Sequence, residues 1–382
     1  MFSPFTISAP SSYRLTSFAK QFVQMHHNVS IVLPSCDRHS NFLLEENTNI
    51  GEIRLIRPRI FNFTEMHMNM IQYSLASVLK SFSLNYDVIH VLKPNILNLS
   101  GYLTKLLHGT PLIQDIDDID HLAMLAENHP QWRVSITKHF EEFLPKFANK
   151  LVTSSSMLEK KYCYLDYGKD NITWIPNGVD TSEFNFKPDP SLKEQLHLRD
   201  KVIVYVGSLN NASQVDLLLK AMKPVSKEKR DTSCLIIGDG TAKKQLQLLT
   251  RRLNLEDCVI FLGRIPHIEV TKLLSISDIG FACFRRTDAL AGASNLKVFE
   301  YMASGLSIIV SPVGDLPYYV DFGKAGMIVE PTLKDITNSL LELLDNDEKR
   351  KTLKIEALRN IKKFDWRVLA ERLATVYMTA KD

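Results

Sequence analysis

Acidic side chains gather where one short apolar run of this sequence ends. Asp115, Asp117, Asp118 and Asp120 follow or close the run PLIQDI at 111–116. Carboxylates in this position are candidate ligand contacts, because ligands of parallel sheets bind beyond the carboxyl ends of the strands. They could equally be helix N-caps in contact with solvent. Both readings stay open from the residues alone.

Four further loops combine glycine with basic or acidic side chains after apolar runs. Amides pointing inward, with one cation and one carboxylate, suit a nucleoside diphosphate and its ribose. The simpler alternatives are a tight turn at each glycine, a surface position for Arg264, and an i,i+3 ion pair between Lys297 and Glu300. The loops are VGSLNNASQ (206–214), IGDGTAKKQ (237–245), GRIPHIEV (263–270) and RRTDALAGASNLKVFEYMASG (285–305).

Composition excludes several classes of protein. The 382 residues hold 46 Lys and Arg against 43 Asp and Glu, and 45% are hydrophobic, which is typical of a globular chain. A net charge of +3 gives no indication of nucleic-acid binding. The five cysteines form no CxxC pair, so neither a zinc site nor a disulfide framework is predicted, and a reducing cytosol suits them. No apolar stretch approaches the roughly 20 residues of a membrane span. The dinucleotide and P-loop fingerprints are incomplete or missing.

Short β-branched runs alternate with amphipathic segments from end to end, which predicts an α/β fold with parallel sheets. The stretch PNGVDTSEFNFKPDPS after residue 175 separates two such series, so we expect two doubly wound domains. Ligands of such sheets bind beyond the carboxyl ends of the strands. The cleft between the domains is the default active site. The expected strands are 29–33, 53–56, 88–92, 111–116, 151–155, 202–207, 234–240, 259–263, 279–283 and 307–312.

A series of motifs resembles the GT-B glycosyltransferases of family 4, also called glycosyl transferases group 1, in the branch with a KxFEYM-type helix. The upstream HVLKPN and PLIQDIDD resemble the acceptor-side domain of these proteins, so the similarity spans essentially the whole chain. The motifs of the donor side are IPNGVD (175–180), VDLLLKAM (215–222), IGDG (237–240), FLGRIP (261–266), KVFEYMASG (297–305) and FDWRVLAERLATVY (364–377).

The resemblance implies an architecture and an activity. An acceptor-side Rossmann-like domain is expected at 1–178, a nucleotide-sugar domain at 179–364, and a helix returning to the first domain at 365–382. The expected reaction moves a sugar, with retention, from a nucleotide-sugar donor to a glycan or lipid-linked acceptor, as in polysaccharide biosynthesis. No metal, no cofactor and no nucleic acid is implied. The expected location is cytoplasmic, with contact to the inner membrane face left open.

The resemblance also implies roles for individual residues. Asp117 stands where relatives place a polar catalytic residue, with Asp115 beside it, and Ser11 and Ser12 replace the first loop near the donor phosphate. The expected donor-binding residues are Gly207, Ser208, Gly238, Asp239, Gly240, Arg264, Ile265, Pro266, Ser294, Asn295, Leu296, Lys297 and Glu300.

Several positions depart from the family pattern. Ser208 and Ser213 replace an Arg and a Lys that grip the diphosphate, and Gly292 replaces the first of two paired glutamates. Lys297, Arg264, Arg285 and Arg286 are the candidate substitutes for the two cations. Relatives also begin with a full strand before residue 1, so a longer reading frame or a truncation is expected.

Three alternatives remain at this point. The chain could be a weakly active sugar-nucleotide or glycan binder, or a nucleotide-sugar epimerase of the same architecture. The Met- and aromatic-rich segment 61–82 could contact a lipid-linked acceptor at a membrane, although a buried helix is favoured because no basic face accompanies it.

Overall fold

The computed structural model describes residues 1, 12–32, 42–43, 46–50, 53–57, 60–61, 72, 75–80 and 86–381. Its contacts divide the chain into two compact units. Unit 1 comprises Met1–Asn177, Gly292–Ser294 and Trp366–Asp382, and unit 2 comprises Gly178–Ala291 and Asn295–Asp365. Each unit is described by itself.

The strands of unit 1 form a four-stranded parallel sheet and smaller sheets. The four-stranded sheet has the order β6-β7-β8-β9, and a three-stranded sheet has the order β1-β4-β3. All residues of β6 and β7 are buried, as expected for a parallel strand covered on both faces. The strands are β1 (Ser30–Val32), β2 (Phe42–Leu43), β3 (Glu46–Ile50), β4 (Ile53–Arg57), β5 (Ile60–Phe61), β6 (Ile89–Leu92), β7 (Leu112–Ile116), β8 (Lys150–Thr153) and β9 (Ile172–Trp174).

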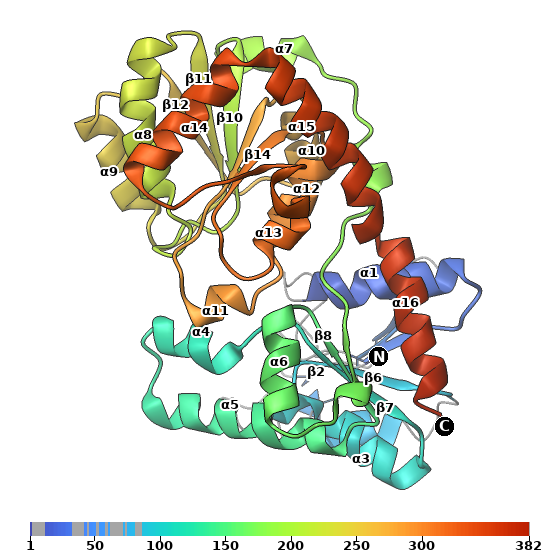
Figure 1. The fold of residues 1–382 in the computed structure, drawn as a ribbon. Helices are drawn as coiled ribbons and strands as arrows, with labels where there is room; N and C mark the ends of the chain where they lie inside the picture. The colour runs from blue at the N-terminus through green and yellow to red at the C-terminus, as the bar shows by residue number, and fades with distance from the viewer. Residues whose placement is uncertain are drawn as a thin grey trace. The chain divides into compact units, whose positions relative to one another are not determined.

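The last helix of the chain packs in unit 1 against its first helix. The ring of Trp366 is almost completely buried and lies 5.0 Å from the ring of Phe18 and 6.0 Å from that of Tyr13, centre to centre. Figure 1 shows α16 beside α1. The helices of unit 1 are α1 (Tyr13–Gln24), α3 (Leu99–His108), α4 (Asp120–Ala126), α5 (Gln131–Phe143), which continues into the 3-10 helix η3 (Leu144–Phe147), α6 (Ser156–Tyr164) and α16 (Trp366–Thr379).

Unit 2 contains a single six-stranded parallel sheet of the doubly wound type. Its order is β12-β11-β10-β13-β14-β15, so the direction of winding reverses between β10 and β13. In such sheets ligands bind at this switch point, beyond the carboxyl ends of the two strands. The strands are β10 (Lys201–Val206), β11 (Thr232–Ile237), β12 (Val259–Gly263), β13 (Ile279–Ala282), β14 (Ser307–Val310) and β15 (Met327–Ile328).

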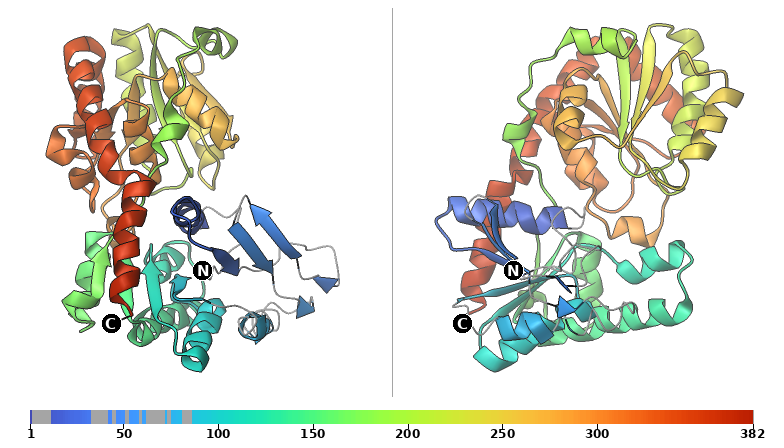
Figure 2. Two further views of the ribbon diagram at one scale, coloured as in Figure 1. Left: turned by 90° about the vertical axis from the view of Figure 1, so that its right-hand side faces the viewer. Right: turned by 180° about the vertical axis from the view of Figure 1, so that it is seen from behind.

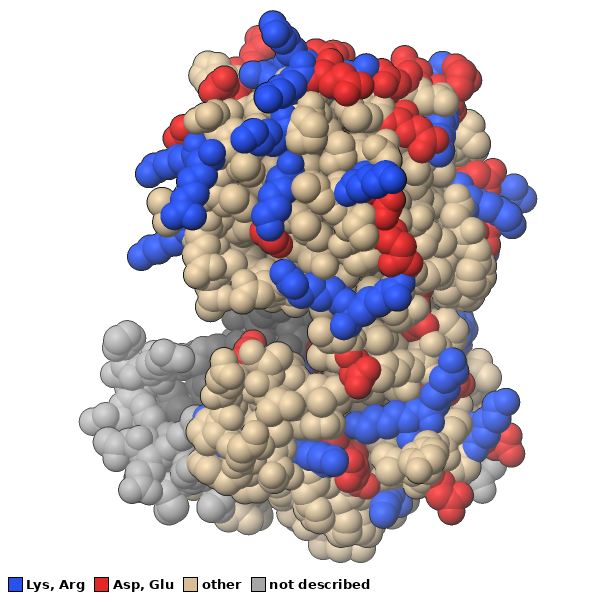
Figure 3. Space-filling view, turned by 60° about the vertical axis from the view of Figure 1, so that its left-hand side comes forward, with Lys and Arg blue, Asp and Glu red and all other residues tan. Residues whose placement is uncertain are grey.

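Helices cover both faces of this sheet (Figure 2). A large apolar core joins α8 and α14 to one face, and on the other the ring of Phe299 lies 5.0 Å from that of Phe364. On the face shown in Figure 3, Lys and Arg side chains are spread over the surface, with Asp and Glu side chains among them. The helices are α7 (Pro190–Gln195), α8 (Val215–Glu228), α9 (Lys243–Arg252), α10 (His267–Ser275), α11 (Asp288–Ala291), α12 (Leu296–Ala303), α13 (Leu316–Tyr319), α14 (Leu333–Asp345) and α15 (Asp347–Asn360), with the 3-10 helix η5 (Thr181–Phe184) before them.

The predicted fold class is confirmed, and each run expected as a strand contains one within a few residues of the predicted limits. Most of the segment 61–82, and Ser11, lie outside the described residues.

Candidate active site

The loops at the switch point of unit 2 are joined to one another through their backbones. The Gly207 amide, directly after β10, donates to the Ile237 carbonyl at 2.9 Å. The Gly238 amide, directly after β11, donates to the Gly263 carbonyl at 2.8 Å. These bonds align the ends of β10, β11 and β12, so the predicted donor-binding loops form one continuous edge.

Two glycines of the IGDG motif permit this close approach. A Cβ atom on Gly238 would lie 1.9 Å from the Gly207 carbonyl oxygen, and one on Gly240 would lie 2.4 Å from the Leu209 carbonyl oxygen. Both distances are impossible for a side chain, so any other residue would push the loops apart. Between them, Asp239 pairs with Lys243 at 2.8 Å.

The backbone amides of the loop after β10 are largely used within the protein. The Gly207 and Leu209 amides donate to carbonyls of the neighbouring loop, and the Ala212 and Ser213 amides donate to the Asn210 side chain at 3.0 and 3.1 Å. These four amides therefore already have acceptors within the protein, and the expectation that this loop holds an anion at the start of α8 stays a prediction. The exposed Ser208 lies at the open side of this loop.

Lys297 brings a cation to the end of β10. Its Nζ atom donates to the Tyr205 hydroxyl at 3.0 Å and lies 4.1 Å from the centre of that ring. It also lies 5.0 Å from the ring of Phe284, which follows β13. A Cβ atom on Gly207 would be only 2.6 Å from Nζ. The ammonium group is thus held between the two strands that flank the switch point.

The three arginines considered as substitutes have different surroundings. Arg285 Nε donates to the Asn211 carbonyl at 2.7 Å, which places this guanidinium beside the loop after β10. Arg286 instead forms a two-bond pair with Glu330 at 2.6 and 2.8 Å. Arg264 is exposed, and Ile265 and Pro266 lead from it into α10. Lys297 and Arg285 are therefore the cations nearest the switch point among these four.

Glu300 pairs with a histidine rather than with Lys297. His267 Nε2 lies 3.1 Å from Glu300 Oε1, and its Nδ1 lies 3.6 Å from Glu183 Oε2 in η5. The alternative of an i,i+3 pair between Lys297 and Glu300 is wrong, since each has its own partner. The Glu300 side chain is mostly buried, at 14% exposure, which fixes the direction of its carboxylate.

The remaining predicted donor residues begin α12. Asn295 is its N-cap residue and Leu296 its first residue. Ser294 is buried and clusters with unit 1, where its hydroxyl accepts from the Asn177 amide at 2.9 Å. The Asn177 side chain donates to the Ser294 carbonyl at 2.8 Å. Ser12, also in unit 1, is buried at the start of α1.

In unit 1 a buried lysine lies among the carboxylates at the end of β7. Lys93 Nζ lies 2.6 Å from Asp120, 3.3 Å from Asp118 and 3.4 Å from Asp117. Lys93 directly follows β6 with φ of 62°, a conformation that costs energy for a residue with a side chain. The Asn98 side chain donates to its carbonyl at 2.8 Å. The strained backbone directs the ammonium group into the acidic cluster.

Asp117 has the most perturbed carboxyl of this cluster. Burial raises its pKa to about 7, the Lys93 ammonium opposes that rise, and the neighbouring Asp118 carboxylate adds to it. The Ser154 hydroxyl donates to its backbone carbonyl at 2.6 Å. A carboxyl with a pKa near neutrality can both donate and accept a proton in hydrogen bonds to a substrate.

Asp115 is held in a separate buried network. Its Oδ2 accepts from Arg14 Nε at 2.8 Å and lies 3.3 Å from His90 Nε2, whose Nδ1 is 2.8 Å from the Tyr377 hydroxyl. The pKa of Asp115 is lowered by Arg14 despite burial, and burial lowers that of His90. Arg14 also donates to the Ile175 carbonyl at 2.9 Å. This network ties α1, β6, β7 and α16 together.

Comparison with known proteins places the chain in a family. Residues 189–359 match the model of glycosyl transferases group 1, and residues 12–183 match that of glycosyltransferase family 4. The chain belongs to the family 4 glycosyltransferases. It is 23% identical over 320 residues to D-inositol 3-phosphate glycosyltransferase of Corynebacterium aurimucosum, covering 79% of this chain and 73% of that protein.

Two further similarities bear on donor and acceptor. Phosphatidyl-myo-inositol mannosyltransferase of Mycolicibacterium smegmatis is 23% identical over 301 residues, covering 77% of this chain and 72% of that protein. The structure of HepE from Anabaena with UDP and glucose superposes with a TM-score of 0.74 at 16% identity, covering 99% of this chain and 98% of that one. The structural similarity to HepE shows that this chain has the GT-B fold.

Several residues of the candidate site could not be recognised from the sequence. Arg14 and His90 reach Asp115 only through the fold, and Tyr205 reads as an ordinary strand residue. Lys93 and His267 could have been proposed from the sequence. Lys93 directly follows the expected strand 88–92, and His267 lies in the loop after the expected strand 259–263. Within the described residues, none of the helices is long and apolar enough to cross a membrane.

Proposed function

We propose that this glycosyltransferase moves a sugar, with retention and without a metal, from a nucleoside-diphosphate sugar to a glycan or lipid-linked acceptor. One observation carries the proposal. The Lys297 ammonium is held between Tyr205 and Phe284 at the switch point, next to Gly207. A fixed cation at this position can neutralise the diphosphate as it leaves, which is the largest electrostatic demand of the reaction.

The donor is assigned to unit 2. Lys297, with Arg285 beside the same loop, supplies the positive charge that Ser208 and Ser213 lack. Glu300, oriented by His267, is assigned to the donor ribose, because a carboxylate accepts hydrogen bonds from two hydroxyls. HepE in complex with UDP and glucose supports a nucleotide-sugar donor.

The acceptor is assigned to unit 1. Asp117, whose pKa burial raises to about 7 against the opposing Lys93 ammonium, contacts a hydroxyl of the transferred sugar or of the acceptor. The acceptor oxygen attacks the anomeric carbon from the side of the leaving group, the bond from that carbon to the phosphate oxygen breaks, and the phosphate takes the acceptor proton. The names of the inositol phosphate and phosphatidylinositol relatives support a phosphorylated or lipid-linked acceptor.

A nucleotide panel followed by product analysis tests the proposal. We expect one of UDP, GDP, ADP and CMP to stabilise the chain selectively in a chelating buffer, and the matching sugar nucleotide to give a product whose anomeric proton coupling equals that of the donor. An inverted product, a requirement for added metal, or donor turnover without acceptor would each contradict it. The last outcome would favour an epimerase.

A further inference from the structure

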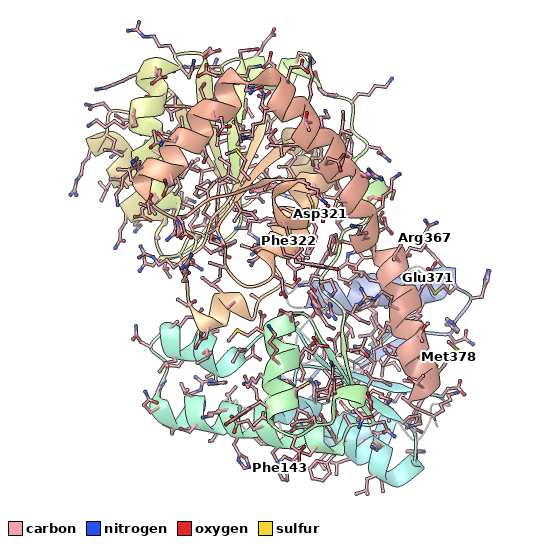
Figure 4. The ribbon with its side chains drawn as sticks, viewed as in Figure 1. Phe143, Asp321, Phe322, Arg367, Glu371 and Met378 are labelled. Atoms are coloured by element: carbon pink, nitrogen blue, oxygen red, sulfur yellow. The ribbon has the colours of Figure 1, made fainter. Side chains whose placement is uncertain are left out.

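An exposed apolar strip runs along one side of α5 in unit 1. Trp132, Ile136 and Phe143 are 57%, 48% and 43% exposed, and Phe147 in the adjoining η3 is 50% exposed. The spacing of four and seven residues places Trp132, Ile136 and Phe143 on one face of α5, and the ring of Phe147 lies 5.0 Å from that of Phe143, centre to centre. The opposite face is internal, because Val134 is buried there. In Figure 4 the side chain of Phe143 lies on the outer surface of α5.

The end of α3 extends the strip. Leu106 is 80% exposed, and Leu103 and Leu107, one turn before and one residue after it, are 41% and 56% exposed. Lys105 Nζ donates to the Phe147 carbonyl at 2.6 Å, which fixes the end of α3 to η3. Figures 1 and 2 show α3 and α5 along the same side of unit 1. The apolar strip therefore comprises Trp132, Ile136, Phe143, Phe147, Leu103, Leu106 and Leu107.

The charges around the strip are mainly positive. The elements that carry it, α3, α5 and η3, contribute Lys105, Arg133, Lys138 and Lys146. Their acidic residues are Glu142, which lies 3.9 Å from Lys138, and Glu141, which is buried against His121 and Lys161. An apolar helix face flanked by cations matches a surface that combines hydrocarbon with negative charge.

We infer that the apolar strip docks unit 1 onto an anionic lipid surface. Trp132 and the leucine and phenylalanine side chains would enter the boundary between headgroups and acyl chains, while the lysines face the lipid phosphates. A contiguous exposed apolar patch of this kind marks an interaction surface in a soluble chain. The inference extends the proposed function, since a lipid-linked acceptor is presented at such a surface.

Vesicle binding of the full chain tests the inference, with Trp132 as a built-in probe. Trp366 is buried and Trp174 half-buried, so a change in exposed tryptophan emission reports mainly on Trp132. We expect the chain to sediment with phosphatidylglycerol-containing vesicles, and its emission to shift to shorter wavelength. Vesicles of phosphatidylcholine alone should bind it more weakly, and added salt should weaken binding to the anionic vesicles.

Matched variants decide whether the strip is responsible. Leu106→Glu and the double variant Leu106→Glu/Phe143→Glu should lower binding to the anionic vesicles by at least about tenfold. The reason is that apolar side chains that leave water on binding are replaced by charged ones. The control Ile355→Glu changes a side chain that is 63% exposed on α15 of unit 2, and should bind as the unaltered chain does. Unchanged thermal unfolding and nucleotide binding of each variant exclude a folding defect.

Three outcomes would overturn the inference. They are equal binding of the double variant, no binding of the unaltered chain to either vesicle, and a dimer in solution that the double variant dissociates. The dimer would assign the strip to a second copy of the chain. Nucleotide binding is measured separately from vesicle binding, so a failed donor site and a failed docking surface give different results.

Discussion

Replacing Asp117 by asparagine should make the chain more stable near pH 8 and less able to transfer sugar. Burial raises the folded-state pKa of this carboxyl to about 7, whereas an unfolded aspartate ionises near about pH 3.9. Since the folded pKa lies above the unfolded one, the carboxyl stabilises the fold most below the unfolded pKa. That stabilisation is lost as the pH rises through the folded pKa.

The size of the effect follows from the two pKa values. A difference of about three pKa units corresponds to roughly 4 kcal/mol of stability lost near pH 8. Near pH 5 the folded carboxyl keeps its proton while most unfolded carboxyls do not, and the stability lost is only roughly 1–2 kcal/mol. Asparagine has nearly the same shape as aspartate, and its side chain does not titrate. The unfolding free energy of Asp117→Asn relative to wild type should therefore rise by about 2–3 kcal/mol between these pH values.

Urea unfolding at both pH values measures this difference directly. Glu348→Gln is the control, because that side chain is 83% exposed and pairs with the exposed Lys351, so its difference in unfolding free energy from wild type should hardly change with pH. Transfer by Asp117→Asn should fall at both pH values. A constant difference in unfolding free energy between wild type and Asp117→Asn from pH 5 to pH 8 would refute the reasoning. It would mean that Asp117 does not titrate between these pH values in the folded chain.

Two further predictions concern the donor site. Lys297→Met should weaken nucleoside-diphosphate binding by about 10- to 100-fold, because a charge-assisted bond worth roughly 1.5–3 kcal/mol is lost. Titration calorimetry measures this affinity, with the half-exposed Lys272→Met as control, and equal affinities of wild type and Lys297→Met would exclude Lys297 from the diphosphate. His267→Ala should weaken binding of the ribonucleotide by about fivefold and leave that of its 2′-deoxy analogue nearly unchanged, whereas the half-exposed His129→Ala should affect neither. An equal loss for both nucleotides would remove Glu300 and His267 from ribose recognition.

The sequence was sufficient to predict the secondary structure around the site because that structure is local. Runs of β-branched residues end at the loops that carry Gly207, Gly238 and Arg264, and the motif order places these loops in one domain. The strand order that brings β10 next to β13 is the ordinary doubly wound one. Loop positions at the sheet edge could therefore be deduced before any side-chain contact was known.

The partners of the charged residues could not be predicted in the same way. Arg14 and Asp115 are separated by 101 residues, and nothing in the sequence of α1 indicates that its arginine points inward. Lys93 reaches the acidic cluster only because its backbone adopts a positive φ, which single-residue preferences make unlikely for lysine. The i,i+3 spacing of Lys297 and Glu300 is also that of an ion pair. In the structure, however, Glu300 pairs with His267 of α10 and Lys297 contacts the ring of Tyr205 in β10.

The loop after β10 and the cation of α12 form one electrostatic arrangement. Because Ser208 and Ser213 carry no charge, the loop has no cation of its own, and its amides fasten it to β11 and to Asn210 instead. A loop fixed in this way holds Gly207 in place, and only glycine at that position leaves room for the Lys297 ammonium. The rings of Tyr205 and Phe284 then confine the ammonium. Under the proposed function, a cation fixed in this way would need little reorganisation when charge develops on the leaving phosphate. Lys297 would then supply from a helix the positive charge that Ser208 and Ser213 lack, provided that the loop stays rigid.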